Sequence, residues 1–309
     1  MIYFSRLPAE LVLLVARHAA RDHALRSASW VATLCLVCRS FRRVVTPLLY
    51  DLITVDSVTL DRLAATSKLP DTPLLRTRSL VVASTYTSYI IKPESFASLA
   101  RALRNITSFT GSTESLSRIA CSVDELRLRS AYLVDPTFLG GKSAIAAIQP
   151  VITTLSRLHI VHEIGRPPSM SPKALLGSFQ VEYLIIDVFE RKGEHVDDSD
   201  MDISRDISHW VASAPCLRRV LFRARCVNER TACRALRHVA EWAERERDAR
   251  IWVDDTFVPN PSDDDDDDDD DADAEMTQWD NLDWEDAVAG DCLWLQGHRV
   301  WHPASDGLD

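Results

Sequence analysis

Four residues near the N-terminus have side chains and a spacing that could bind a metal ion. His18 and His23 form an H-x4-H pair, and Cys35 and Cys38 form a C-x2-C pair after it. Imidazoles and thiolates at these spacings can complete a tetrahedron around zinc. Both cysteines, however, lie on the apolar stripe of an expected helix, where free cysteine behaves as a small hydrophobic residue. The favoured prediction is therefore reduced thiols without a metal.

Two further segments match ligand-binding loops only in part. Gly140–Ser143 is similar to the end of a phosphate-binding loop, but Pro136, which has no N–H to offer, stands where that loop needs its first glycine. The acidic residues between 194 and 206 lack the glycine of an EF-type calcium loop. The chain contains no G-x-S-x-G and no H-E-x-x-H motif. We predict a protein that is not an enzyme and has no cofactor and no metal.

The composition supplies enough apolar material for one large domain or two smaller ones. Of the 309 residues, 46% are hydrophobic and 26% are charged, which excludes a disulfide-stabilised miniprotein and a mostly disordered chain. The apolar run Leu11 to Ala16 is too short for a signal peptide or a membrane-spanning helix. Seven cysteines, an odd number, favour reduced thiols. We therefore predict a cytoplasmic or nuclear protein that does not bind membranes.

The net charge of −11 hides an asymmetry between the body and the tail. From Asp263 onward the chain carries 18 acidic residues and one Arg, a charge of −17, whereas residues 1–262 carry 34 basic and 28 acidic residues, a charge of +6. The arginines are spread along the chain rather than gathered in one stripe, so we predict no nucleic-acid partner.

The first zone of the chain, residues 1–56, is predicted to be helical. Pro8 suits a first helical position, and the following residues Leu11, Leu14, Val15, His18 and Ala19 form one stripe. The same spacing recurs in Val31, Leu34, Cys35 and Cys38, and again from Phe41 to Leu49. These residues predict short helices that share a small core.

The second zone, residues 57–258, repeats the frame apolar-x-x-apolar-x-apolar. Four copies are centred on Leu126, Leu158, Leu184 and Val220, and weaker copies lie near Leu80, Ile106 and Ile251. Each unit is interpreted as a strand followed by a helix or a loop, which predicts an irregular α/β solenoid in which neighbouring units bury each other's apolar edges. An ordinary α/β sheet is the alternative, because the spacing varies and no regular Asn follows the strands.

The third zone is acidic. The nine consecutive residues Asp263 to Asp271 repel one another, so residues 259–278 are predicted to be an extended, disordered linker. Four of the eight tryptophans lie in the final segment, residues 279–309. Tryptophan is costly to leave in water, so we expect this segment to dock on another surface.

Three short motifs in the helical zone resemble an F-box. They are Leu7-Pro8-Ala9-Glu10-Leu11, then Leu36 to Arg42 with the sequence LVCRSFR, and then Pro47-Leu48-Leu49-Tyr50. They occur in the order found in many fungal F-box proteins, and the resemblance covers about the first 50 residues. The interval from Pro8 to Cys38 is a few residues longer than the commonest arrangement.

The resemblance implies a non-catalytic role in ubiquitin ligation. In this family the helical unit docks on the Skp adaptor of a Skp-cullin-F-box ligase through a helix-in-groove contact. The motif positions that would contact the adaptor are Leu7, Pro8, Leu11, Val37 and Phe41. For Val37 and Phe41, a place in the core of the unit remains equally open.

In the same family a repeat domain, often leucine-rich, recruits the protein to be ubiquitinated. The predicted target-binding residues lie between the apolar anchors: Arg127, Arg129, His159, Asp187 and Arg223. An ordinary solvated strand face is the alternative for each of them. We predict a substrate-recognition subunit, and the alternative is a scaffold in which the F-box-like segment only caps the repeats. The acidic tail is expected to fold back on the basic body and occupy the target surface.

Overall fold

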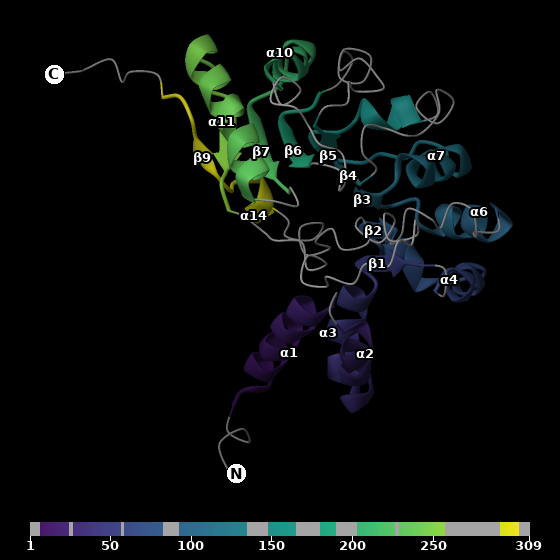
Figure 1. The fold of residues 1–309 in the computed structure, drawn as a ribbon. Helices are drawn as coiled ribbons and strands as arrows, with labels where there is room; N and C mark the ends of the chain where they lie inside the picture. The colour runs from purple at the N-terminus through teal and green to yellow at the C-terminus, as the bar shows by residue number, and fades with distance from the viewer. Residues whose placement is uncertain are drawn as a thin grey trace, which may run out of the picture.

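The computed structural model describes residues 7–24, 27–56, 59–82, 93–134, 148–164, 180–189, 203–225, 229–256 and 291–302. Within these ranges the protein consists of three N-terminal helices followed by a nine-stranded sheet with helices along one face (Figure 1). The predicted α/β class is confirmed. The predicted acidic linker, the Gly140–Ser143 turn and residues 190–202 lie outside the described residues.

The helices are α1 (Ala9–His23), α2 (Ala28–Val37), α3 (Arg39–Leu49), α4 (Leu60–Ser67), the 3-10 helix η2 (Pro73–Arg76), α6 (Pro93–Ala102), α7 (Thr113–Ser122), α10 (Ser204–Ser213), α11 (Glu229–Glu246) and α14 (Asp291–Trp294). The strands are β1 (Leu52–Val55), β2 (Ser79–Val82), β3 (Ser108–Gly111), β4 (Ser130–Leu133), β5 (Arg157–Glu163), β6 (Tyr183–Phe189), β7 (Arg219–Ala224), β8 (Ile251–Asp254) and β9 (His298–Arg299).

Local sequence signals explain where the N-terminal helices begin and end. Pro8, with φ near −52°, occupies the N-cap of α1. Cys38 has an extended backbone that separates α2 from α3, and its Sγ accepts a 3.5 Å hydrogen bond from the N–H of Phe41. The three helices enclose a small core whose fully buried members are Ala20, Val31 and Val45.

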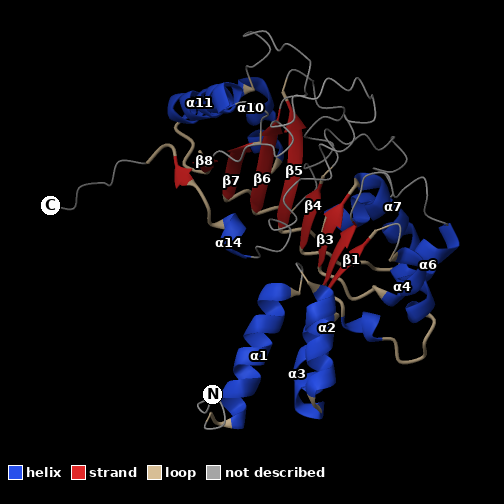
Figure 2. Ribbon diagram, turned by 60° about the horizontal axis from the view of Figure 1, so that its bottom comes forward, coloured by secondary structure: helices blue, strands red, loops and turns tan. Residues whose placement is uncertain are grey.

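The sheet follows the order of the sequence. Each strand pairs with the next one along the chain, β1 to β8 run parallel, and β9 pairs antiparallel with β8. Helices α4, α6, α7, α10 and α11 form an arc along one side of the sheet (Figures 1 and 2). Side chains of these helices share one apolar core with alternate residues of the strands. This arrangement leaves the opposite face of the sheet to other contacts.

The predicted apolar frame identifies the strands, but one copy is misplaced. Leu158, Leu184 and Val220 occupy equivalent positions in β5, β6 and β7, as the frame requires. In the preceding unit the equivalent residue is Ala131 of β4, not Leu126, which lies before that strand. Alanine contributes little apolar signal, so the pattern selected the larger leucines five residues upstream.

One row of equivalent residues crosses all eight parallel strands, and none of its members is more than 6% exposed. Neighbouring members are 22 residues (Phe109 to Ala131) to 36 residues (Leu184 to Val220) apart in sequence. The row is Ile53, Leu80, Phe109, Ala131, Leu158, Leu184, Val220 and Ile251.

A backbone hydrogen-bond ladder repeats at the start of the strands. The carbonyl oxygen of Asp51 accepts from two successive N–H groups, those of Arg78 and Ser79. The same pattern recurs in the following units, where one carbonyl oxygen accepts from two successive N–H groups of the next unit at 2.8–3.2 Å. The accepting carbonyls are those of Arg78, Thr107, Arg129, Ser156 and Glu182. The ladder gives the backbone groups at the strand starts partners within the main chain. It therefore removes the need for the regular Asn that the sequence lacks.

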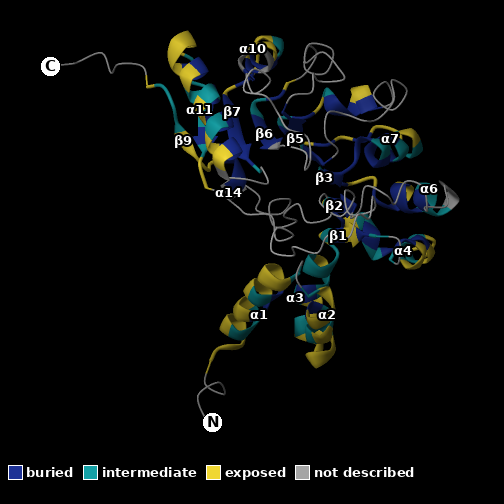
Figure 3. Ribbon diagram, viewed as in Figure 1, coloured by how far each residue is buried: buried dark blue, intermediate teal, exposed yellow. Residues whose placement is uncertain are grey.

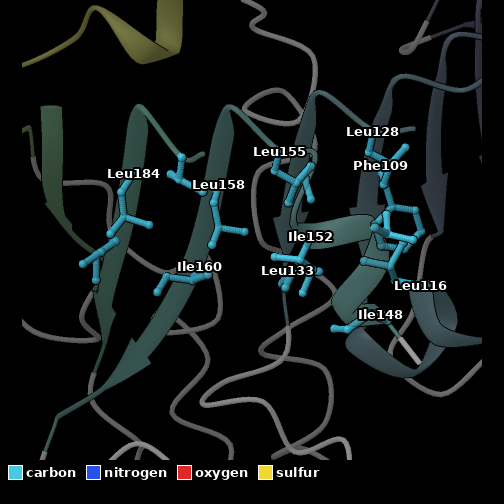
Figure 4. Packing of buried hydrophobic residues seen from close by; sticks show 14 of the residues in the cluster. Phe109, Leu116, Leu128, Leu133, Ile148, Ile152, Leu155, Leu158, Ile160 and Leu184 are labelled. Carbon is cyan, nitrogen blue, oxygen red and sulfur yellow. The ribbon is translucent and has the colours of Figure 1, made fainter. Parts of the chain in front are cut away.

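The core on the helix side is continuous along the sheet (Figure 4). Phe109 on β3 and Leu116 on α7 pack together with Leu133 of the next strand. Gly111 ends β3 with φ near +154°, and a Cβ there would lie 2.9 Å from the Phe109 ring and 3.1 Å from Val82 Cβ. The large phenylalanine ring thus occupies the space that a side chain at position 111 would need.

Candidate functional site

The helical unit has an unusually apolar surface. Among the described residues, nine large hydrophobic side chains are exposed, and seven of them belong to this unit. Exposed residues are yellow in Figure 3, where they dominate α1 and α2. The strands are mostly buried by comparison, and helices α4, α6, α7 and α11 have one buried and one exposed side. The seven exposed side chains are Leu7, Leu11, Leu14, Val15, Trp30, Leu36 and Val37.

The expectation that the α1 stripe contributes to the shared core is wrong for Leu14 and Val15, and Leu11, which is also a predicted adaptor-contact residue, is exposed too. Leu11, Leu14 and Val15 are 46%, 48% and 60% exposed, whereas the buried side chains of this helix are Ala16 and Ala20. The spacing of the stripe is helical, as predicted, but spacing does not say which face of a helix meets its neighbours. The small alanines pack inside and the large aliphatic side chains face outward.

The five predicted adaptor-contact residues are mostly exposed. Leu7, Pro8, Leu11 and Val37 are exposed, and Phe41 is half-buried. A place in the core is therefore excluded for Val37. The N-terminal end of α1 and the α2–α3 junction lie at the end of the unit away from the sheet (Figure 1). Sequence reasoning missed Leu36, at 84% exposure, although it stands within the second motif.

A second feature is a buried charged cluster on the sheet face opposite the helices. It consists of His159 on β5, Asp187 on β6 and Arg223 on β7, each no more than 1% exposed. Arg223 donates from Nε to Oδ1 of Asp187 at 2.7 Å and from Nη2 to Oδ2 at 2.8 Å. His159 Nε2 lies 2.7 Å from Oδ2 of the same carboxylate. The fork of Arg223 is thus bidentate, the strongest geometry for such a pair.

Tyr132 on β4 completes the cluster. Its ring stacks on the imidazole of His159, with centroids 3.7 Å apart and planes inclined by 5°. The two residues are register partners on neighbouring strands. Asp187 and Arg223 are also register partners, so the parallel pairing itself brings the four side chains together.

The charge of Asp187 is set by its neighbours. Burial alone would raise the pKa of this carboxyl, but the attraction of Arg223 and then of His159, together with their hydrogen bonds, holds the pKa of Asp187 far below its usual range. Asp187 is therefore ionised and faces the Arg223 guanidinium throughout the physiological range. The arrangement is that of a buried, bidentate ion pair.

The expectation that the predicted target-binding residues face outward holds for only two of them. His159, Asp187 and Arg223 do share one sheet face, but they are buried. Arg127 and Arg129 are exposed, and both precede β4 rather than standing on it. The apolar frame predicts these two arginines on a strand because its copy lies five residues too early, at Leu126 instead of Ala131.

The same sheet face also carries the C-terminal segment, residues 291–302. Leu293 and Trp294 of α14 are 2% and 9% exposed and pack with Ile185 of β6 and Leu221 of β7. The guanidinium carbon of Arg157 lies 5.7 Å from the centroid of the Trp294 ring, within the range of a cation–π contact. The prediction that the Trp-bearing end docks is confirmed for the described part of that end.

Polar contacts continue the attachment beyond α14. Arg219 Nη2 donates to the carbonyl oxygen of Gln296, and the Arg219 guanidinium lies 3.7 Å above the ring of Trp252 on β8. Burial lowers the pKa of Arg219, and nearby Arg299 lowers it further, against the opposite influence of Tyr183. Strand β9 then pairs with β8 through Arg299 opposite Trp252 and His298 opposite Val253.

Within the described ranges, no three His, Cys, Asp or Glu side chains are grouped so that they could hold a metal ion. His18, His23 and Cys38 are exposed, and Cys35 is half-buried beside Thr46. None of the described helices combines the length and apolar character that crossing a bilayer requires.

Comparison with known proteins gives no match: neither the protein-family models nor the curated proteins that were searched resemble this chain.

Proposed function

We propose that this protein is the substrate-recognition subunit of a Skp-cullin-F-box type ubiquitin ligase. The F-box-like helices dock on the Skp adaptor, which links the chain to the cullin scaffold, and the sheet domain recruits a protein target. The chain holds a target near enzymes that supply the chemistry, so it raises effective concentration and catalyses nothing itself. Its place of action is the cytoplasm, the nucleus or both.

The observation that carries the proposal is the concentration of exposed apolar side chains on α1 and α2. Isolated exposed leucines are ordinary, but a group of large apolar residues on one small unit is typical of a protein-binding surface. Each such side chain contributes about 1.5–3 kcal/mol when it is fully buried. Four of the exposed residues, Leu7, Pro8, Leu11 and Val37, match motif positions of the F-box resemblance.

The sheet domain is proposed to be a leucine-rich-like solenoid. Its support is the sequential order of parallel strands, the row of equivalent buried residues and the repeated backbone ladder. In such an architecture each unit contacts mainly its neighbours, and the face opposite the helices forms an extended binding surface.

The test is co-expression with a Skp adaptor followed by size-exclusion chromatography. The wild-type chain should elute as a one-to-one complex, and the variant Leu7→Ala plus Leu11→Ala should lose at least tenfold in affinity. Leu69→Ala is the matched control, because Leu69 is 55% exposed but lies outside the helical unit. A folded wild-type chain that elutes alone would contradict the proposal.

A second candidate is a scaffold without a ligase partner, in which the helical unit caps the sheet. Its support is Tyr50, directly after α3, which packs against the main core of the sheet domain. This candidate predicts that deletion of residues 1–50, which removes Tyr50 together with the helices, unfolds the sheet domain, because repeat arrays require a cap at each end. Retention of the wild-type thermal transition after the deletion would argue against it.

A further inference from the structure

The face of the sheet between β5 and β8 has the features of a peptide-binding surface. Ile185 and Leu221 supply an apolar floor, and Tyr183 and Trp252 border it. Arg157 supplies a cation that faces an aromatic ring seated there. The edge of β8 that pairs with β9 supplies backbone groups for an added strand. This combination fits a peptide that places an apolar and an aromatic side chain shortly before a strand.

The chain's own residues 291–302 already match that description. Leu293 and Trp294 contact Ile185 and Leu221, and β9 begins four residues after Trp294 and pairs with β8. The attachment is small, however: α14 has four residues, β9 has two, and the side chains from Leu295 to His298 are exposed. Ordering twelve residues costs conformational entropy, which offsets part of the stabilisation from the two buried side chains, from the contacts of Arg157, Arg219 and Val300, and from the short ladder. The net stability of the attachment is therefore smaller than the sum of its contacts.

We propose that the β5–β8 face is the target-binding surface and that residues 291–302 are its built-in occupant. A target displaces this occupant with a peptide that presents a Leu-Trp pair to Ile185 and Leu221 and then adds a strand to β8. The proposal depends on the proposed function only in assigning the displacing peptide to a ubiquitination target. The exchange itself needs no adaptor.

Because residues 291–302 belong to the same chain as the β5–β8 face, they compete with any peptide that is added. An occupant on the same chain competes at an effective concentration in the millimolar range. An external peptide with the same residues binds only those wild-type molecules from which the internal segment is released. Its apparent Kd therefore equals the intrinsic Kd divided by the fraction of such molecules. A change that weakens only the internal occupant raises the affinity for the external peptide.

The experiment uses the full chain and a fluorescein-labelled peptide with the sequence of residues 291–302, carrying Ser in place of Cys292. Fluorescence anisotropy measures its binding to the wild type and to Trp294→Ala. We expect the variant to bind the peptide at least tenfold more tightly than the wild type. Leu295→Ala is the matched control, because Leu295 adjoins the anchor but is 68% exposed, and it should leave the affinity unchanged.

A second variant weakens the internal segment in a different way, so that the test does not depend on the folding of Trp294→Ala alone. Gly297 has φ near +78°, and a Cβ there would lie 2.6 Å from the carbonyl oxygen of Val253. Gly297→Val therefore blocks the pairing of β9 without removing an apolar anchor, and it should also raise the affinity for the labelled peptide. Adding Arg157→Ala to Trp294→Ala should lower that affinity again.

Equal affinities of the wild type, Trp294→Ala and Gly297→Val for the peptide would overturn the proposal, as would the absence of binding by both variants. Neither result depends on adaptor binding. Co-purification with the Skp adaptor is measured separately on the same wild-type protein, so failure of the peptide exchange and failure of the proposed function remain distinguishable.

Discussion

Replacing Asp187 with Asn should destabilise the protein strongly. The side chain keeps its shape but loses the negative charge that faces Arg223 at 2.7 Å and 2.8 Å and His159 at 2.7 Å. All three side chains are no more than 1% exposed, so water does not replace the lost charge. Removing one partner of a buried ion pair costs about 3–5 kcal/mol. For a domain of this size, that loss lowers Tm by about 6–20 °C.

Urea unfolding followed by circular dichroism measures this loss. The control is Glu182→Gln, which breaks an exposed pair with Arg218 whose atoms are 3.5 Å apart. Exposed pairs contribute about 0–1 kcal/mol, so the control should be nearly neutral. The m-value should stay unchanged in both variants, because neither alters the area exposed on unfolding. If Asp187→Asn costs no more than Glu182→Gln, the cluster is solvated and the reasoning from burial is wrong.

A double-mutant cycle sharpens the same prediction. Arg223→Met removes the guanidinium, and in that background the further change Asp187→Asn should cost much less than it does alone. Residues joined in one buried network show interaction energies of about 0.5–3 kcal/mol. Additive losses would mean that the two side chains contribute independently, which the bidentate geometry does not allow.

Two further perturbations follow from the same structure. The folded-state pKa of Asp187 lies below its unfolded value of about 4, so its stabilising contribution is complete above pH 4 and is lost as the pH falls below that value. The difference in unfolding free energy between the wild type and Asp187→Asn should therefore shrink from pH 5 to pH 3, and a difference that is constant with pH would refute this assignment. Gly111→Val should cost about 1–3 kcal/mol in urea unfolding, because its Cβ would meet the Phe109 ring at 2.9 Å at a backbone φ near +154°. An unchanged unfolding midpoint would show that Phe109 moves freely.

The sequence predicts the strands better than it predicts their faces. Leu158, Leu184 and Val220 stand where the apolar frame places them, because buried parallel strands require large aliphatic residues at fixed spacing. The frame fails at Ala131, where a small residue fills the equivalent position. A single alanine is too weakly hydrophobic to be recognised as part of an apolar repeat. Its place in the row is seen only from the pairing of the strands.

Burial of the charged cluster could not be derived from the sequence. His159, Asp187 and Arg223 look like solvated positions between apolar anchors, since each is polar and each alternates with a buried residue. Their burial depends on pairing across strands that are 28 and 36 residues apart in the chain. Similarly, the helical spacing of Leu11, Leu14 and Val15 predicts one face of α1 but does not say that two alanines occupy the inside.

The sheet face opposite the helices divides into two parts along the strands. Tyr183 and Arg219, at the starts of β6 and β7, lie beside the C-terminal segment, whereas Asp187 and Arg223, four residues later on the same strands, form the charged cluster. The apolar pair Ile185 and Leu221 stands between them. Because successive positions on one face of a strand are two residues apart, the ion pair between Asp187 and Arg223 fixes the register of β6 and β7 beside the apolar contact. In the proposed exchange, this ion pair stays in place while the contact of Leu293 and Trp294 with Ile185 and Leu221 is replaced.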